Sequence, residues 1–212
     1  FIASVLSEKY NVLKTEGNFN NEIGLPLTVF NIRDSHQVAV LEMGISDFGE
    51  MTRLTKIARP DVCVITNIGL CHLENLGSRD GILKAKTEIF NYAGEHYYTV
   101  LNGDDDKLAG LKSQNENDIV FYGMEKEQGI YAENIKLLGI EGSECSIVTK
   151  NGTIPVHISI PGKHMIYNAM AAAAVGLVLG LNTDEIKVGI EKLENVGGRL
   201  NIIRNGKITI ID

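Results

Sequence analysis

Two apolar runs, Gln37–Met43 and Val62–Thr66, constrain the fold more than any other feature of the sequence. Each run has the length of a strand and stays apolar until it nears its end, which is typical of a strand covered on both faces. Segments with a helical period follow both runs, at Phe48–Ala58 and in the stretch that contains Lys84 and Lys86. Because strands that alternate with helices form parallel or mixed sheets, the sequence predicts an α/β fold with helices on both faces of a mostly parallel sheet.

The second half of the chain carries a different pattern. Further strands are expected at Tyr97–Leu101 and Asp118–Tyr122, and three segments within Ile130–Ile160 then alternate in polarity between glycine-containing turns. This alternation predicts a small antiparallel β subdomain. A helix is expected within Pro161–Leu181, and a hairpin is expected around the turn at Asn205–Gly206 near the end of the chain.

Lys86 occupies an unusual position on its predicted helix. A 3.6-residue period places Lys86 in the middle of the apolar face, whereas Lys84 falls on the opposite face, four residues before Glu88, as expected of a solvated ion pair. An unpaired ammonium on an apolar face is costly, so we expect Lys86 to have an altered charge state. The alternative is that its stem lies on the apolar surface and its ammonium reaches the helix edge. The pattern alone does not decide between them.

Polar side chains follow both apolar runs, where open α/β sheets bind ligands. Glu42 lies at the end of the first run, and the loop after the second run holds Asn67 and His72, shortly before Lys86. A histidine, acids and an unusual lysine at strand ends predict a metal and phosphate site. Glu42 equally fits an acid that emerges into solvent at the rim of the sheet.

Two further polar stretches allow more than one interpretation. The stretch Thr15–Pro26 contains Asn18, Asn20 and Asn21, and it is either a turn-rich surface loop or a clamp for a polar ligand, since an asparagine side chain both donates and accepts hydrogen bonds. The acidic triplet Asp104–Asp106 is interpreted as the solvated start of a helix rather than as a metal site.

Charge and composition exclude several classes of function. The net charge of −7 argues against nucleic acid as the main partner, although backbone donors on an acidic protein still bind phosphate. No apolar run has the length and composition of a membrane span, and no signal peptide is visible, so no membrane insertion is expected. Three cysteines without a ligand spacing fit a reducing cytoplasm, and all three are interpreted as structural.

Several stretches, taken together and in order, resemble the Mur ligase family over almost the whole chain. Any one of them is a weak signal, but the ordered set is specific. The asparagine-rich loop is similar to the type that adds D-alanyl-D-alanine to UDP-N-acetylmuramoyl-tripeptide. The stretches are TEGNFNNEIGLPLT (Thr15–Thr28), VLEMGISDFGEM (Val40–Met51), TNIGLCHLENLGS (Thr66–Ser78), KAKTEIF (Lys84–Phe90), LNGDDD (Leu101–Asp106), PGKHMIYNAMAAAA (Pro161–Ala174) and GRL (Gly198–Leu200).

The resemblance implies the central ATPase domain of a bacterial cytoplasmic ligase that makes a peptidoglycan precursor, with a sheet like that of P-loop NTPases. ATP would phosphorylate the carboxylate of a nucleotide-linked peptide, and an amine would attack the acyl phosphate. Residues 1–196 would form this domain, and residues 197–212 would form a hinge and the first hairpin of the C-terminal ligase domain.

The resemblance also implies roles for individual residues. Glu42 and His72 look like Mg²⁺ ligands, and Lys86 looks like the lysine that is N-carboxylated and supports a second Mg²⁺. A carbamate would make Lys86 an anion and remove the difficulty of an inward-facing cation. The other implied positions are Asn18, Asn20, Asn21 and Asn67 for the substrate, and Asn168, Arg199 and Asp212 for ATP.

The sequence contains no G-x-x-x-x-G-K-[ST] phosphate loop. We therefore expect the chain to be a piece of a longer enzyme, without its UDP-binding and C-terminal domains, and to be inactive by itself. Two alternatives stay open. One is a related ligase that takes another amine or acid, such as a folylpolyglutamate-type enzyme, and the other is a non-catalytic nucleotide-binding paralogue.

Overall fold

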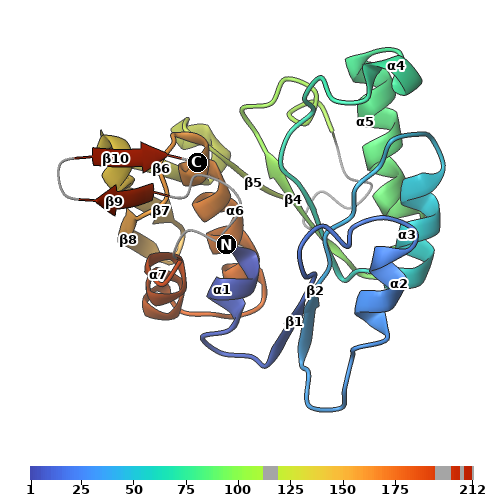
Figure 1. The fold of residues 1–212 in the computed structure, drawn as a ribbon, viewed down its shortest axis with the longest axis horizontal. Helices are drawn as coiled ribbons and strands as arrows, with labels where there is room; N and C mark the ends of the chain where they lie inside the picture. The colour runs from blue at the N-terminus through green and yellow to red at the C-terminus, as the bar shows by residue number, and fades with distance from the viewer. Residues whose placement is uncertain (112–118, 194–201, 206–207, 212) are drawn as a thin grey trace.

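The computed structural model describes residues 1–111, 119–193, 202–205 and 208–211. It has an α/β architecture in which helices pack on both faces of a mostly parallel sheet (Figure 1). The helices are α1 (Ile2–Leu6), α2 (Gly24–Val29), α3 (Glu50–Ala58), α4 (Leu73–Leu76), α5 (Arg79–Thr87), α6 (His164–Val178) and α7 (Thr183–Glu191), with short 3₁₀ helices η1 (Glu88–Tyr92), η3 (Lys126–Gln128) and η4 (Gly139–Glu141). The strands are β1 (Val12–Lys14), β2 (Val38–Val40), β3 (Val62–Ile65), β4 (Tyr98–Asn102), β5 (Ile119–Gly123), β6 (Ile130–Leu137), β7 (Ser143–Thr149), β8 (Gly152–Ile158), β9 (Ile202–Asn205) and β10 (Ile208–Ile211).

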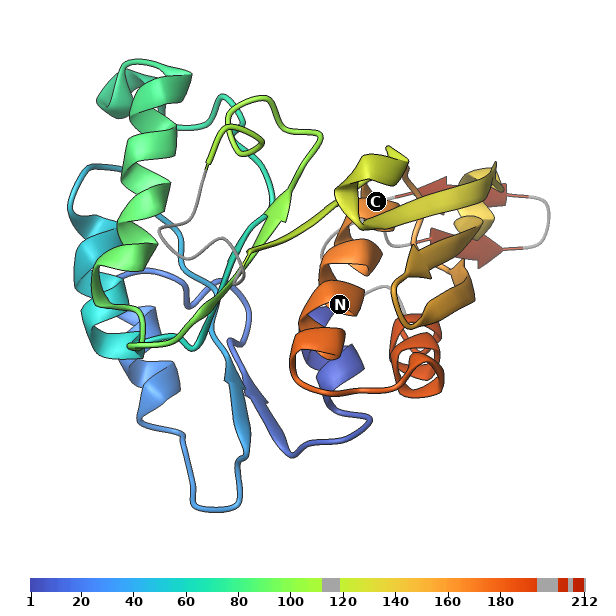
Figure 2. The ribbon, with the colours of Figure 1, turned by 180° about the vertical axis from the view of Figure 1, so that it is seen from behind.

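The largest sheet is parallel in one part and antiparallel in the other. Its strand order is β3-β4-β5-β6-β7-β8, with parallel pairing from β3 to β6 and antiparallel pairing from β6 to β8. The antiparallel strands lie on the opposite side of the molecule from α3 and α5 (Figure 2). The predicted antiparallel subdomain is confirmed, and so is the terminal hairpin, in which β9 pairs with β10.

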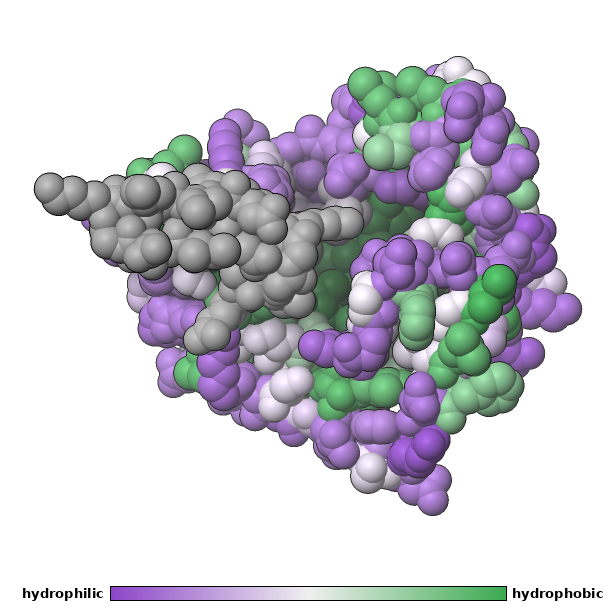
Figure 3. Space-filling view, in the orientation of Figure 1, coloured by the Kyte–Doolittle hydropathy of each residue, from purple (hydrophilic) through white to green (hydrophobic). Residues whose placement is uncertain are grey.

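The first strands do not join this sheet. β1 and β2 pair in parallel as a separate two-stranded sheet. Within the described residues β2 pairs only with β1 and β3 pairs only with β4, so each has one edge without a neighbouring strand. A strand does form within Gln37–Met43, but the prediction that it is covered on both faces is wrong, because β2 has three residues and Ala39 is exposed. Between the two halves of the molecule the space-filling view shows a hollow with apolar atoms at its bottom (Figure 3).

Strand β4 separates two hydrophobic cores. Val100 belongs to the core beneath α1, α6 and α7, and Leu101 belongs to the core beneath α3 and α5; both side chains are fully buried. Alternate side chains of a strand point to opposite faces, so one strand supplies both cores. On the first face, α6 brings a row of buried alanines from Ala169 to Ala174 that allows close packing.

Glu88 does not form the solvated pair with Lys84 that its spacing predicts. Its carboxylate accepts hydrogen bonds from the amides of Gly49 (2.9 Å) and Thr52 (3.2 Å) and from the Thr52 hydroxyl (2.9 Å). Glu88 therefore caps the start of α3, because the unpaired amides at a helix N-terminus bind a carboxylate more strongly than an exposed ammonium does. Lys84 is exposed and lies over the Phe48 ring.

Among the described helices, none combines the length and the apolar composition that a passage through a bilayer requires.

Helices α1 and α7 approach each other at Gly189. A Cβ atom at Gly189 would lie 2.4 Å from the Cα atom of Val5, and the Ser4 hydroxyl donates to the Gly189 carbonyl at 2.6 Å. We expect Gly189→Ala to lower the free energy of unfolding by about 1–3 kcal/mol, because two backbones must move apart. Urea unfolding followed by circular dichroism measures this.

Gly110→Ala is the matched control. A Cβ atom there would have its nearest neighbour at 3.7 Å, so this variant should leave stability unchanged or raise it slightly. Equal stability of both variants would contradict the close packing of α1 on α7.

Candidate functional site

An open pocket of about 500 Å³ brings three loops together. It is lined by residues 20–23 of the asparagine-rich loop, by residues 44–46 after β2, and by Glu50 and His72. Two of the predicted asparagines, Asn20 and Asn21, thus lie at one cavity with His72. A larger pocket of about 720 Å³ lies along α1 and β1 and contains none of the predicted site residues.

Asn20 connects the asparagine-rich loop with the predicted metal ligand Glu42. Its side-chain amide donates to Glu42 Oε1 at 2.9 Å, and its carbonyl accepts from the Gly44 amide at 2.7 Å. Gly44 permits this approach, since a Cβ atom there would lie 3.0 Å from Asn20 Nδ2. The backbone of Glu42 is held by the Thr15 hydroxyl, which accepts from the Glu42 amide at 2.9 Å. Glu42 is thus exposed at the sheet rim but hydrogen-bonded there, at its side chain by Asn20 and at its backbone by Thr15.

The other two asparagines of this loop have different positions. Asn21 Oδ1 accepts from the amides of Ile23 (3.1 Å) and Gly24 (2.8 Å), so its side chain fixes the start of α2. Asn18 is exposed, and its carbonyl accepts from the Asn20 amide at 2.7 Å. The loop bends sharply at Gly24, where a Cβ atom would lie 2.4 Å from the Cα atom of Phe19. The sequence therefore encodes a folded loop that presents Asn20, and not a surface turn alone.

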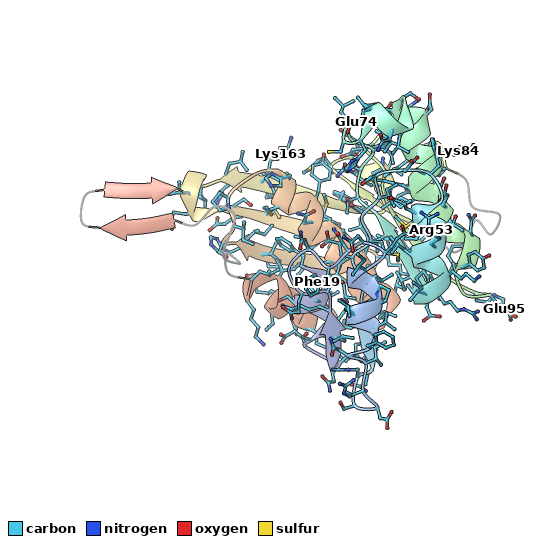
Figure 4. The ribbon with its side chains drawn as sticks, turned by 45° about the vertical axis from the view of Figure 1, so that its right-hand side comes forward. Phe19, Arg53, Glu74, Lys84, Glu95 and Lys163 are labelled. Carbon is cyan, nitrogen blue, oxygen red and sulfur yellow. The ribbon has the colours of Figure 1, made fainter. Side chains whose placement is uncertain are left out.

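His72 begins helix α4 in the left-handed conformation, with φ of 64°. Such a φ is uncommon for a residue other than glycine, although histidine tolerates it better than most. The His72 carbonyl accepts from the amides of Asn75 (3.2 Å) and Leu76 (3.0 Å). These hydrogen bonds of the short helix offset the cost of the left-handed conformation. The imidazole is exposed at the pocket. Glu74 on α4 and Lys84 on α5 lie near the outer end of this half of the molecule (Figure 4).

Lys86 points inward, toward the loop after β3. Its ammonium donates to the Asn67 carbonyl at 2.9 Å, and its side chain is half-buried. Burial lowers the pKa of Lys86 from its usual value. The structure thus places Lys86 inward and Lys84 outward, as the helical period predicts. It is the backbone of Asn67 and not its exposed side chain that binds Lys86.

The triplet Asp104–Asp106 lies in a turn at residues 103–110, so the prediction of a helix start is wrong. Asp105 is also not solvated: only 8 % of its side chain is exposed, and it accepts a hydrogen bond from the Ile68 amide. Asp104 accepts from the Met124 amide (2.7 Å) and the Tyr167 hydroxyl (2.8 Å). Sequence reasoning missed Asp105 and its neighbour Arg79, because a buried acid in an acidic run looks like the exposed acids beside it.

Asn168, the predicted nucleotide-binding residue that the structure describes, does not line the 500 Å³ pocket. Asn168 lies on α6, where its side-chain amide is 3.6 Å from the Met165 sulfur. Its neighbour Tyr167 connects α6 to the turn after β4 through Asp104. Arg199 and Asp212 lie outside the described residues.

The donor set is compatible with Mg²⁺ only if other ligands complete it. Within the described part of the chain, no group of three or more His, Cys, Asp and Glu side chains could hold a metal ion. Glu42 supplies a carboxylate and His72 an imidazole on adjoining loops. Mg²⁺ is commonly held by one or two carboxylates together with water and phosphate oxygens, and these residues fit that arrangement rather than an all-protein cage.

The interpretation of all three cysteines as structural is wrong for Cys71, which is exposed on the loop before His72. Burial raises the pKa of Cys63 to about 12 and that of Cys145 to about 11. Because the thiolate is the reactive form, iodoacetamide at about pH 8 should label Cys71 in the folded chain and spare the two buried thiols. Intact-mass measurement checks this. Cys71→Ser is the control, and rapid labelling of Cys63 in that variant would contradict the burial.

Lys86 should make stability depend on pH. Its pKa is lowered below 10.5 in the folded chain, so between the lowered pKa and 10.5 the unfolded chain binds more protons. The contribution of Lys86 to the free energy of unfolding therefore increases with pH between the lowered pKa and 10.5. Relative to Lys86→Met, the wild-type chain should gain free energy of unfolding as pH rises from about 7 toward 10.5.

Urea unfolding at a series of pH values measures this difference. Lys84→Met removes an exposed ammonium of the same helix, and its curve should run parallel to that of the wild type. A Lys86→Met curve that is also parallel to the wild type would contradict the desolvation of Lys86.

Comparisons with known proteins identify the family and the fold. Residues 1–176 match the model of the Mur ligase middle domain. A UDP-N-acetylmuramoyl-tripeptide–D-alanyl-D-alanine ligase of Bacillus subtilis is 39% identical over 203 residues, which cover 96% of this chain and 43% of the relative. A structure of MurF from Acinetobacter baumannii superposes with a TM-score of 0.92 at 32% identity and covers all of this chain (100%) and 46% of that one.

A MurF ligase from Thermotoga maritima, solved in complex with ADP, has a TM-score of 0.85 at 29% identity, with 100% of this chain and 48% of that chain covered. The chain therefore spans less than half the length of the relatives that it matches. The family model covers most of the chain in one continuous match. The chain belongs to the Mur ligase family, as a middle domain.

Proposed function

We propose that this chain is the central domain of an ATP-dependent ligase that adds D-alanyl-D-alanine to UDP-N-acetylmuramoyl-tripeptide during peptidoglycan precursor synthesis. The observation that carries the proposal is the asparagine-rich loop, which folds onto Glu42 and shares one pocket with His72. A relative that bears the name of this ligase is 39% identical over 96% of the chain. The reaction needs ATP, so we place it in the bacterial cytoplasm.

The proposed reaction has two steps. A carboxylate oxygen of the tripeptide attacks the terminal phosphorus of ATP and releases ADP. The amine of the dipeptide then attacks the acyl carbon, phosphate leaves, and the amine gives up a proton. Bound Mg²⁺ would offset the negative charge that gathers on the phosphates and the carboxylate. In this chain Glu42 and His72 would hold that ion, and Asn20 fixes the orientation of Glu42.

Asn18, Asn20, Asn21 and Asn67 are the proposed substrate-binding residues. The pocket lining and the exposed amide of Asn18 support the first three. Asn67 would contribute its exposed side chain while its backbone carbonyl binds Lys86. An asparagine side chain can pair with both the amide and the carboxylate of a peptide, which suits a dipeptide substrate.

Lys86 is the proposed site of N-carboxylation. Its amine nitrogen would attack the carbon of CO₂ and lose a proton, which gives a carbamate. Only the neutral amine reacts, and the burial that lowers the pKa of Lys86 favours that form. The carbamate would present two oxygens to a second Mg²⁺ beside Asn67, where a cationic ammonium could not.

The nucleotide would lie toward α6. Asn168 is the proposed adenine-side residue, and Arg199 and Asp212 are proposed to contact the nucleotide and its ribose. The connection of Tyr167 to Asp104 supports this placement, since it fixes α6 against the turn that follows β4.

Further parts of the enzyme would complete the site. We propose that residues 1–196 form the central domain, that residues 197–212 form the hinge and the first hairpin of the ligase domain, and that the phosphate loop and the UDP-binding domain are supplied by other parts of the polypeptide. In the part of the chain that the structure describes, β2 and β3 each have one unpaired edge, which can accept another strand. Ile23 and Phe30, the residues that flank α2, are 75% and 76% exposed and share one helix face with Leu27, which suits contact with a further domain.

Turnover by the full-length protein tests the proposal. Phosphate release should require ATP, UDP-N-acetylmuramoyl-tripeptide and D-alanyl-D-alanine together, and Lys86→Arg should lower kcat by about 100-fold, because an arginine cannot form the carbamate. Lys84→Arg is the matched control on the same helix and should keep wild-type activity.

The 212-residue chain alone should not turn over, since its sequence lacks a phosphate-loop motif. If phosphate release by the full-length protein needs a different amine or acid, the result would favour a related ligase. If no amine or acid supports phosphate release, the result would favour a non-catalytic paralogue. Full activity of Lys86→Arg would contradict the role of Lys86.

A further inference from the structure

The backbone of Ile68, in the loop after β3, is held by a charged side chain at its amide and by another at its carbonyl. The Ile68 amide donates to Asp105 Oδ2 at 2.7 Å, and the Ile68 carbonyl accepts from Arg79 Nε at 3.0 Å. The Ile68 side chain is itself 2% exposed and packs in the core beneath α3 and α5. Hydrogen bonds to charged groups are roughly twice as strong as neutral ones, so this residue is fixed at its amide, its carbonyl and its side chain.

The two charged residues are in turn fixed by other contacts. Asp105 uses Oδ1 to accept from the amides of Lys107 (3.0 Å) and Leu108 (3.2 Å), and 8% of its side chain is exposed. Arg79 binds both oxygens of Asp106, at 3.0 and 2.6 Å, and lies 3.7 Å from Asp105 Oδ1. A buried carboxylate whose oxygens are all used for hydrogen bonds holds its position well.

Arg79 and Lys86 act on consecutive residues of the loop. They lie seven residues apart on α5, which places them two turns apart on the same face. Arg79 binds the carbonyl of Ile68, and Lys86 binds the carbonyl of Asn67. One helix face thus holds two neighbouring carbonyls, and Asp105 holds the amide between them.

We propose that Asp105 and Arg79 are positioning residues that keep the loop of residues 66–72 in place independently of Lys86. This inference rests on the proposed function, in which carboxylation changes Lys86 from a cation to an anion. That change weakens the hydrogen bond from Lys86 to the Asn67 carbonyl, whereas the hydrogen bonds of Asp105 and Arg79 with Ile68 do not involve Lys86. The loop ends at His72, so its position decides where the imidazole lies relative to Glu42 and Lys86.

Neighbouring carboxylates provide a matched comparison. Asp105→Asn cannot satisfy both sets of amides, because the asparagine NH₂ group must face either the Ile68 amide or the amides of Lys107 and Leu108. Asp106→Asn removes the same charge beside the same arginine but has no bond to the loop. Lys86→Met removes the contact to Asn67 and leaves the Ile68 contacts intact.

Amide hydrogen exchange in the 212-residue chain, read by NMR, measures the loop directly. In Asp105→Asn the Ile68 amide should exchange at least about tenfold faster, while the Val100 amide in β4 keeps its rate. In Asp106→Asn and Lys86→Met both rates should stay within about threefold of the wild type. Arg79→Gln, which retains a donor but loses the ionic bonds, should also accelerate exchange at Ile68 and keeps the test valid if Asp105→Asn does not fold.

Two outcomes overturn the proposal. One is an Ile68 rate that is unchanged in Asp105→Asn and Arg79→Gln, and the other is an acceleration in Lys86→Met as large as that in Asp105→Asn. In the full-length enzyme, Asp105→Asn should lower kcat by about tenfold with little change in the KM for ATP, because the loop and not the nucleotide is displaced. Since the exchange experiment needs no turnover, an inactive full-length protein with the expected exchange pattern would contradict the proposed function alone.

Discussion

The structure depends on one strand that is buried on both faces. β4 gives Val100 to one core and Leu101 to the other, and both side chains are completely inaccessible to solvent. A strand in this position needs helices on each side, which α6 supplies on one face and α3 and α5 on the other. Because helices cover both faces, the loops at the strand ends lie at the rim of the sheet, and most of the described candidate site residues lie in these loops.

The rim holds its functional groups through backbone contacts. Lys86 binds a carbonyl, Asp105 binds an amide, and Glu42 is fixed by Asn20 and by the Thr15 hydroxyl. A loop that is fixed at its backbone leaves its own side chains free to face a ligand, as the exposed His72 and Asn67 do. Among the described residues, the polar side chains at this edge therefore form no compact metal cluster of their own.

Much of this arrangement could be predicted from periodicity. The strand–helix alternation, the antiparallel strands after Ile130 and the inward position of Lys86 follow from the 2.0- and 3.6-residue periods. Glu88 and Asp105 could not be assigned in this way. Each binds amides of a segment distant in sequence, 39 and 37 residues away, and no local pattern distinguishes such an acid from a solvated one. The division of the parallel strands into two sheets was missed for the same reason, because strand pairing is a contact between distant segments.

The sequence by itself determined the fold class, the family and the residue types at the strand ends, because hydrophobic periodicity and ordered motifs are local properties of a chain. Only the tertiary structure decided which of those residues meet. It brought Asn20 to Glu42, gave Asn21 a capping role, and placed the backbone of Ile68 between Asp105 and Arg79. These choices depend on how distant segments pack, where a shift of one residue in register would direct the same side chains into solvent.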